Sequence, residues 1–129
     1  MKALSVIMPW PWLILHHGKD VENRSWRTNY RGRLFIHASL TPAADAVQIV
    51  GRYHANITAD ELQKLFDQCG CIVGSVEVVD CVRNYDSPWA MKGFWHWVLR
   101  DPVPLEKPIP IKGHLGLWEY EPRKNEEQR

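Results

Sequence analysis

A short segment near the amino terminus holds an amine, a carboxylate and a guanidinium at close spacing. Lys19, Glu22 and Arg24 form a Lys-x-x-Glu-x-Arg pattern. Lysine and arginine bind phosphates or polarise carbonyl groups, and a carboxylate accepts from a base amino group or acts as a general base. The pattern indicates a ligand site, or an acid–base pair made of Lys19 and Glu22. The alternative is a structural ion pair between Glu22 and Arg24 beside a solvated Lys19.

Cations and aromatic rings are concentrated around this pattern. Residues 9–39 contain five Lys or Arg side chains and two Asp or Glu, a local charge of +3, whereas the whole chain carries +1. Rings and guanidinium groups stack on bases, and cations bind phosphates. We therefore expect a pocket for an anionic, planar ligand, which a nucleotide fits better than a sugar or a lipid. The candidate binding residues are Trp12, Lys19, Glu22, Arg24, Trp26, Tyr30, Arg31 and His37.

Two predicted elements precede the pattern, and a third carries it. Residues 3–8 are predicted as a buried strand, and residues 12–17 as a short helix with Pro11 in its first turn and Gly18 at its end. Residues 21–26 alternate in the manner of a strand, which sets Glu22, Arg24 and Trp26 on one face.

A third strand is predicted over residues 33–38, with His37 on the face opposite Leu34 and Ile36. His37 can point into the pocket or be a hydrogen-bonded structural residue. The residues between the strands, which include Tyr30 and Arg31, are predicted as a turn that can supply a stacking face and a phosphate contact, or pack over the mouth of a barrel.

The rest of the chain is predicted to contain helices followed by strands. Gly74 indicates a bulge or the close approach of another backbone, and four prolines exclude residues 101–110 from a central strand. The loop over residues 84–92 can form a lid or a second wall of the pocket through Ser87, Trp89 and Lys92. The predicted elements are a helix starting at Thr41-Pro42, a helix with the capping box of Thr58 and Glu61 that ends by Gly70, and strands over 71–82, 94–99 and 113–120.

Length and composition limit the class of protein. A chain of 129 residues with 45% hydrophobic residues fits one domain, predicted over residues 1–122, followed by a charged, disordered tail over 123–129. Strands with two or three helices favour a small α+β barrel. The three cysteines and the histidines lack zinc-site spacing, so no metal is expected, and no cofactor fingerprint is present. We expect a cytoplasmic protein without a membrane span, and monomer and weak dimer both stay open.

The order of the motifs resembles the ASCH domain family of the PUA-like superfamily. The motifs are Pro11-Trp12 with Leu13-Ile14, the Lys19, Glu22, Arg24 and Trp26 pattern, Tyr30-Arg31-Gly32, Ile36-His37-Ala38-Ser39, and 108–118. They extend over about residues 3–120. The resemblance implies a small mixed β-barrel with flanking helices, and a cleft lined by the Lys-x-x-Glu-x-Arg motif that binds RNA or a nucleoside or nucleotide.

The resemblance also leaves other functions open. Some ASCH proteins are metal-independent hydrolases, either ribonucleases or amidohydrolases of N4-acylated cytidine, and a protein-interaction module is a further alternative. Two positions depart from the family pattern. His17 stands where a glycine is usual, with Gly18 one residue later, and Glu22 stands where the amidohydrolases have a threonine nucleophile. Because a carboxylate does not replace an alcohol nucleophile, binding is favoured over amide hydrolysis.

Overall fold

The computed structural model describes residues 1–122 of the chain. Its strands and helices follow one another in an order that puts all three helices before the two longest strands. The elements are β1 (Lys2–Val6), α1 (Trp10–His16), β2 (Val21–Arg24), β3 (Gly32–Ala38), α2 (Ala46–Tyr53), α3 (Ala59–Phe66), β4 (Cys71–Val82), β5 (Trp95–Pro110) and β6 (Leu117–Glu119). The tail predicted over residues 123–129 lies outside the described residues.

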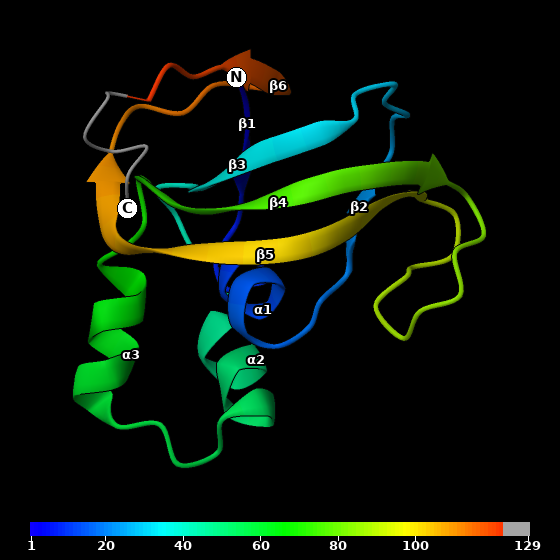
Figure 1. The fold of residues 1–129 in the computed structure, drawn as a ribbon. Coiled ribbons are helices and arrows are strands. Elements are labelled where there is room, and N and C mark those ends of the chain that lie inside the picture. Colours follow the sequence, from blue (N-terminus) through cyan, green and yellow to red (C-terminus); the bar gives the residue numbers. More distant parts are fainter. Residues whose placement is uncertain (123–129) are drawn as a thin grey trace.

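The strands form one six-stranded sheet in the order β2-β5-β4-β3-β1-β6. β1 pairs in parallel with β3, and the other neighbouring strands are antiparallel. The long strands β4 and β5 bend where their register shifts, and the sheet curls into a half-barrel (Figure 1). The α+β class and the barrel-like sheet predicted from the sequence are confirmed.

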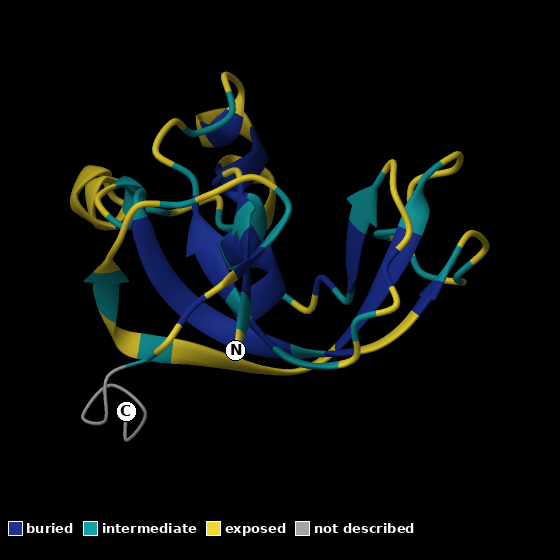
Figure 2. Ribbon diagram, turned by 90° about the horizontal axis from the view of Figure 1, so that it is seen from above, coloured by how far each residue is buried: buried dark blue, intermediate teal, exposed yellow. Residues whose placement is uncertain are grey.

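All three helices lie on one side of the curled sheet (Figure 1). The main core lies between the helices and the sheet. It includes Leu4, Ile14 and Trp97, which are almost fully buried. A smaller cluster around Ala3 and Trp118 lies apart from this main core. Figure 2 shows the sheet as a trough whose inside is buried, while much of the second half of β5 is exposed.

The predicted glycine and capping signals are confirmed. Thr58 accepts from the backbone N–H of Glu61, whose carboxylate accepts from the Thr58 N–H, so the capping box starts α3. A Cβ added to Gly74 would lie 2.7 Å from the Val103 carbonyl oxygen and 2.7 Å from a Leu15 methyl carbon. Gly74 therefore permits both the register shift in β4 and the close approach of β5 and α1.

Several predicted boundaries are wrong. The helix predicted from Thr41-Pro42 starts at Ala46, because the Ala43 N–H donates to the Met8 carbonyl at 2.9 Å and fixes the preceding segment in a non-helical path. β2 ends at Arg24, two residues before the predicted end, and β6 covers only Leu117–Glu119.

The proline-rich segment 101–110 is part of strand β5 but has an open side. β5 pairs with β2 only over Trp95–Val98, whereas its pairing with β4 continues to Pro110. Because proline has no N–H to donate, prolines are tolerated on a strand edge that no neighbour occupies. The prediction that this segment is not a central strand is therefore confirmed, although the segment is a strand.

Candidate functional site

A cavity of about 330 Å³ opens between β2, the two helices α1 and α2, and the loop that joins β4 to β5. We call it the central cavity. Its aromatic lining is Trp10 at the start of α1, Tyr53 at the end of α2, and Trp89 in the loop. Its polar lining comes from β2 and the turn before it, through Lys19, Glu22 and Asn23. Pro88 and Met91 complete it.

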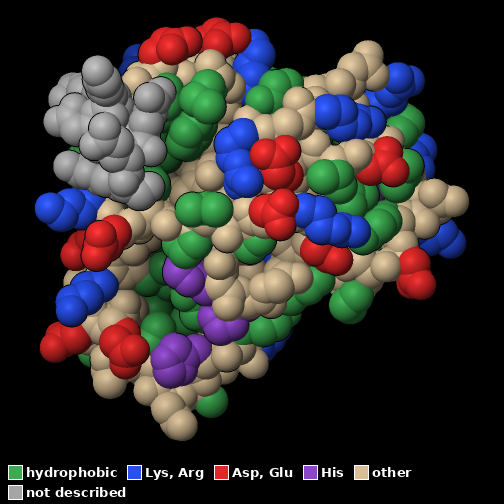
Figure 3. Space-filling model, viewed as in Figure 1, with side chains coloured by type: hydrophobic (Ala, Val, Ile, Leu, Met, Phe, Trp, Pro, Cys, Tyr) green, Lys and Arg blue, Asp and Glu red, His purple; other side chains and the backbone are tan. Residues whose placement is uncertain are grey.

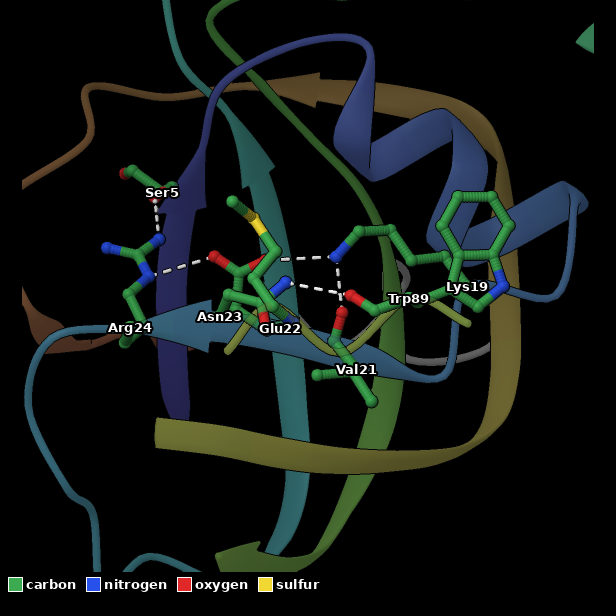
Figure 4. Close-up of polar contacts among 8 residues, drawn as sticks. Ser5, Lys19, Val21, Glu22, Asn23, Arg24 and Trp89 are labelled. Atoms are coloured by element: carbon green, nitrogen blue, oxygen red, sulfur yellow. Dashed lines mark hydrogen bonds and ion pairs between the residues drawn. The ribbon is translucent and has the colours of Figure 1, made fainter. Parts of the chain in front are cut away.

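The polar wall is a chain of charges centred on Glu22. Lys19 Nζ lies 3.6 Å from Glu22 Oε1 and donates to the Val21 carbonyl (Figure 4). Arg24 Nε donates to Glu22 Oε2 at 2.8 Å, and Arg24 Nη2 donates to the Ser5 carbonyl at 2.9 Å. Glu22 and Arg24 are two residues apart on one strand, which places them on the same face, as the sequence predicted.

Burial controls the electrostatics of this wall. Lys19 is 6% exposed and Glu22 is 8% exposed. Desolvation lowers the pKa of the Lys19 amine, and the attraction of Glu22 partly opposes that change. The wall therefore offers an amine donor beside a carboxylate acceptor in a poorly solvated place, where hydrogen bonds to a ligand are strengthened.

The turn before β2 brings Lys19 to the cavity. Gly18 follows the last helical residues with φ of +73°, a left-handed conformation that glycine adopts without strain. The Lys19 N–H then donates to the Leu13 carbonyl at 3.1 Å and turns the chain back over α1. The glycine next to Lys19 thus makes the turn, one residue later than the usual family glycine.

The loop over residues 84–92 is tied to β2 and to the residue before it. Asn23 Nδ2 donates to the Trp89 carbonyl at 3.0 Å, and the Met91 N–H donates to Asn23 Oδ1 at 2.9 Å (Figure 4). Ser87 Oγ donates to Asp20 Oδ1 at 2.6 Å. These bonds set Trp89 at the cavity, where the loop forms a second wall through Pro88, Trp89 and Met91, whereas the predicted Ser87 and Lys92 do not line it.

The aromatic side of the cavity is made by residues far apart in the sequence. The rings of Tyr53 and Trp89 are stacked, with centroids 5.3 Å apart and planes at 28°. Trp10 lines the same cavity, and Lys19 Nζ lies 5.8 Å from the centroid of its ring. The central cavity therefore combines flat apolar walls with one buried ion pair.

Other candidate binding residues lie outside the central cavity. Trp26 packs edge-to-face on Trp97 with centroids 4.8 Å apart. Both ring nitrogens of the buried His37 have partners, Ser5 Oγ at 3.0 Å and the Ile111 carbonyl at 2.7 Å. The structure therefore places His37 in a hydrogen-bonded structural position, which is one of the two alternatives that the sequence left open.

The turn residues and Trp12 are also elsewhere. Tyr30 donates its hydroxyl hydrogen to the Arg33 carbonyl. Arg31 Nη2 lies 3.7 Å from Asp80 Oδ1, and both side chains of this ion pair are exposed. Trp12 lines a different hollow, between the helices.

The cations of residues 9–39 do not converge on one pocket. Lys19 lines the central cavity. Arg24 does not line it but pairs with Glu22, which does. Arg33 pairs with Glu77 at 3.2 Å and Arg27 with Asn29 at 2.7 Å, both away from the cavity lining. The local charge of +3 predicted a cationic pocket, whereas the cavity itself is lined by one cation and one carboxylate.

Five of the eight residues that line the central cavity were not among the candidates from the sequence: Trp10, Asn23, Tyr53, Pro88 and Met91. Trp10 directly precedes the Pro11-Trp12 motif, and Asn23 lies between Glu22 and Arg24. Their position next to predicted site residues in the sequence could have indicated that both lie near the site. Tyr53 carries no such signal, because only the tertiary fold brings the end of α2 to β2.

Within residues 1–122, no group of three His, Cys, Asp or Glu side chains is placed to hold a metal ion. None of the helices in this part of the chain has the length and apolar character needed to cross a membrane.

A curled half-barrel sheet of six strands with three helices is an α+β fold consistent with an ASCH or PUA-like domain. The model of the ASCH domain matches residues 4–126, and the chain belongs to this family. ASCH domains are generally linked to RNA binding.

Two curated relatives are similar over most of the chain. Activating signal cointegrator 1 from Homo sapiens is 28% identical over 134 residues, and its counterpart from Mus musculus is 27% identical over 128 residues. Each alignment covers 92% of this chain and 22% of the relative. The chain thus spans about a fifth of the length of these relatives.

Proposed function

We propose that the central cavity binds an unpaired base of single-stranded RNA. The observation that carries this proposal is the pairing of aromatic walls with a buried amine–carboxylate pair in one cavity. A base needs flat faces for stacking and polar groups for its edge. Trp10, Tyr53 and Trp89 supply the rings, and Lys19 and Glu22 supply a donor and an acceptor.

The charge and size of the cavity favour a base over a phosphate inside it. Glu22 lies between Lys19 and Arg24, so an anion entering the cavity meets a carboxylate as well as an amine. A neutral heterocycle with donor and acceptor groups meets no such repulsion. The volume of about 330 Å³ lies at the lower end of ligand cavities, which range over about 300–1,000 Å³.

The test is the binding of labelled single-stranded RNA hexamers, measured by fluorescence anisotropy at fixed salt. We expect W89A to weaken binding about fivefold to 150-fold, because stacking of one base contributes about 1–3 kcal/mol. K19M should also weaken binding, since it removes the amine from the cavity wall.

W26A and K107M are the matched controls. Trp26 and Lys107 are exposed and lie outside the cavity lining, so binding should persist in both variants. W26A also tests the earlier assignment of Trp26 as a binding residue. Absence of RNA binding by the wild type, or equal binding by W89A, contradicts the proposal.

A second candidate function is hydrolysis in the same cavity. It is favoured by the lowered pKa of Lys19 next to Glu22, because an amine that loses its proton readily can accept one from an attacking water. Water would add to the acyl carbon of an N4-acylated cytidine, and Lys19 would return the proton to the departing amino group. The products are cytidine and a carboxylic acid.

Incubation with N4-acetylcytidine, followed by chromatography, tests this candidate. An unstructured RNA run in parallel tests ribonuclease activity. Products that disappear in K19M and in E22Q support hydrolysis. Products formed equally by a K19M/E22Q double variant come from a contaminant and exclude it.

A further inference from the structure

A second hollow lies between the three helices, apart from the central cavity. It has a volume of about 340 Å³, and we call it the helix hollow. Figure 3 shows histidine side chains gathered on the face where the three helices lie. The residues of the helix hollow that matter here are Trp12, His16, His17, His54, Glu61 and Lys64.

A row of rings connects the helix hollow with the central cavity. Trp89 stacks on Tyr53 at 5.3 Å, Tyr53 lies 6.3 Å from His17, and His17 lies 4.1 Å from Trp12, all measured between ring centroids. The row starts at the wall of the central cavity and ends at the wall of the helix hollow. We call these four residues the ring row.

Nucleic-acid strands bind without sequence preference where aromatic rings follow a groove with positive charge. The helix hollow supplies one lysine, Lys64, and three histidines that add positive charge only when they are protonated. His16 and His17 come from α1 and the residue after it, His54 follows α2, and Lys64 is exposed on α3. Glu61 is the carboxylate that lines the hollow. It already accepts a hydrogen bond from the Thr58 N–H, and its Oε2 lies 3.6 Å from His54 Nε2.

We propose that a strand of RNA with one base in the central cavity continues along the ring row and places a second nucleotide in the helix hollow. This inference rests on the proposed function. Its consequence is that the protein recognises at least two nucleotides, and that α3 takes part in binding although it contributes nothing to the central cavity. A peptide is the less suitable occupant, because flat rings match the faces of bases and the exposed Lys64 matches a phosphate.

The experiment compares uridine 5′-monophosphate with a uridine hexamer, using wild type, W12A, K64E and W89A. We expect W12A to weaken hexamer binding about fivefold or more and to leave binding of the mononucleotide unchanged. Trp12 is half-buried, so W12A can also weaken binding by destabilising the fold. K64E changes an exposed residue and is therefore the second variant. Loss of one phosphate contact lowers the slope of log affinity against log salt by about 0.7.

K107E is the control for K64E, since Lys107 is also an exposed lysine and lies on β5. Wild-type affinity and salt slope in both W12A and K64E would overturn the inference, while a loss in W89A alone would leave the proposed function standing. If wild type binds neither ligand, the proposed function fails with it. Equal mononucleotide and hexamer affinity in the wild type also contradicts a second nucleotide site.

Discussion

Removal of the Asn23 side chain should release the loop that carries Trp89. Asn23 makes two hydrogen bonds to this loop, from its Nδ2 to the Trp89 carbonyl at 3.0 Å and from the Met91 N–H to its Oδ1 at 2.9 Å. Each bond contributes about 0.5–1.5 kcal/mol. Because Asn23 is half-buried, water replaces part of these hydrogen bonds in N23A. We therefore expect N23A to lower the free energy that holds the loop closed by about 1–2 kcal/mol.

That loss should appear in RNA binding. If the loop must be closed to stack Trp89 on a base, a loss of about 1–2 kcal/mol corresponds to a weakening of about fivefold to thirtyfold. N23D should not recover binding, since a carboxylate still accepts from Met91 but faces the Trp89 carbonyl without a donor. N84A is the control, because Asn84 is an exposed residue of the same loop.

The assay combines anisotropy with amide hydrogen exchange. The Met91 N–H should exchange faster in N23A than in the wild type, which shows directly that the loop has opened. Faster exchange together with wild-type affinity for RNA would refute the reasoning, because the ordered loop would then have no part in binding. Unchanged exchange would show that other contacts hold the loop.

Further perturbations test the electrostatics, the packing and the helix hollow. Because burial lowers the pKa of Lys19, the unfolded state binds more protons between the lowered pKa and the ordinary value of about 10.4. The unfolding free energy of wild type should therefore rise relative to K19M as pH increases towards 10 in urea titrations, and parallel curves would contradict this. G74A should cost about 1–3 kcal/mol by overpacking against the Val103 carbonyl, measured by thermal unfolding, and an unchanged Tm would contradict the close approach. Burial and the neighbouring His17 lower the pKa of His16 below its ordinary value of 6.5, so hexamer affinity should rise in wild type only in clearly acidic buffer, and the anisotropy titration of H16Q should lack this rise; an equal rise in H16Q would contradict a part for His16.

Local signals predicted those parts of the fold and site that depend on neighbours in the sequence. The capping box at Thr58 and the shared strand face of Glu22 and Arg24 follow from spacings of three and two residues, and the structure has both. The fixed periods of helix and strand make such contacts nearly independent of the rest of the fold. The start of α2 was not predictable in this way, because the backbone bond from Ala43 to Met8 overrides the Thr41-Pro42 signal.

The composition of the cavity depended on contacts between distant segments. Tyr53 and Trp89 stack although 36 positions separate them, and the charge count could not tell which cations would share a cavity. Arg33 was counted with Lys19, but its strand directs it to Glu77. Counting charges along a segment therefore overestimated the positive charge of the site.

The indole N–H signals of the seven tryptophans provide the most direct test of RNA binding in the central cavity. They can be assigned by single Trp-to-Phe substitutions and followed in a ¹H–¹⁵N spectrum as a uridine hexamer is added. The signals of Trp10 and Trp89 should shift with the same affinity, while those of the buried Trp97 and Trp118 should stay in place. A shift confined to Trp26 or Trp118, with Trp10 and Trp89 unchanged, would contradict the account.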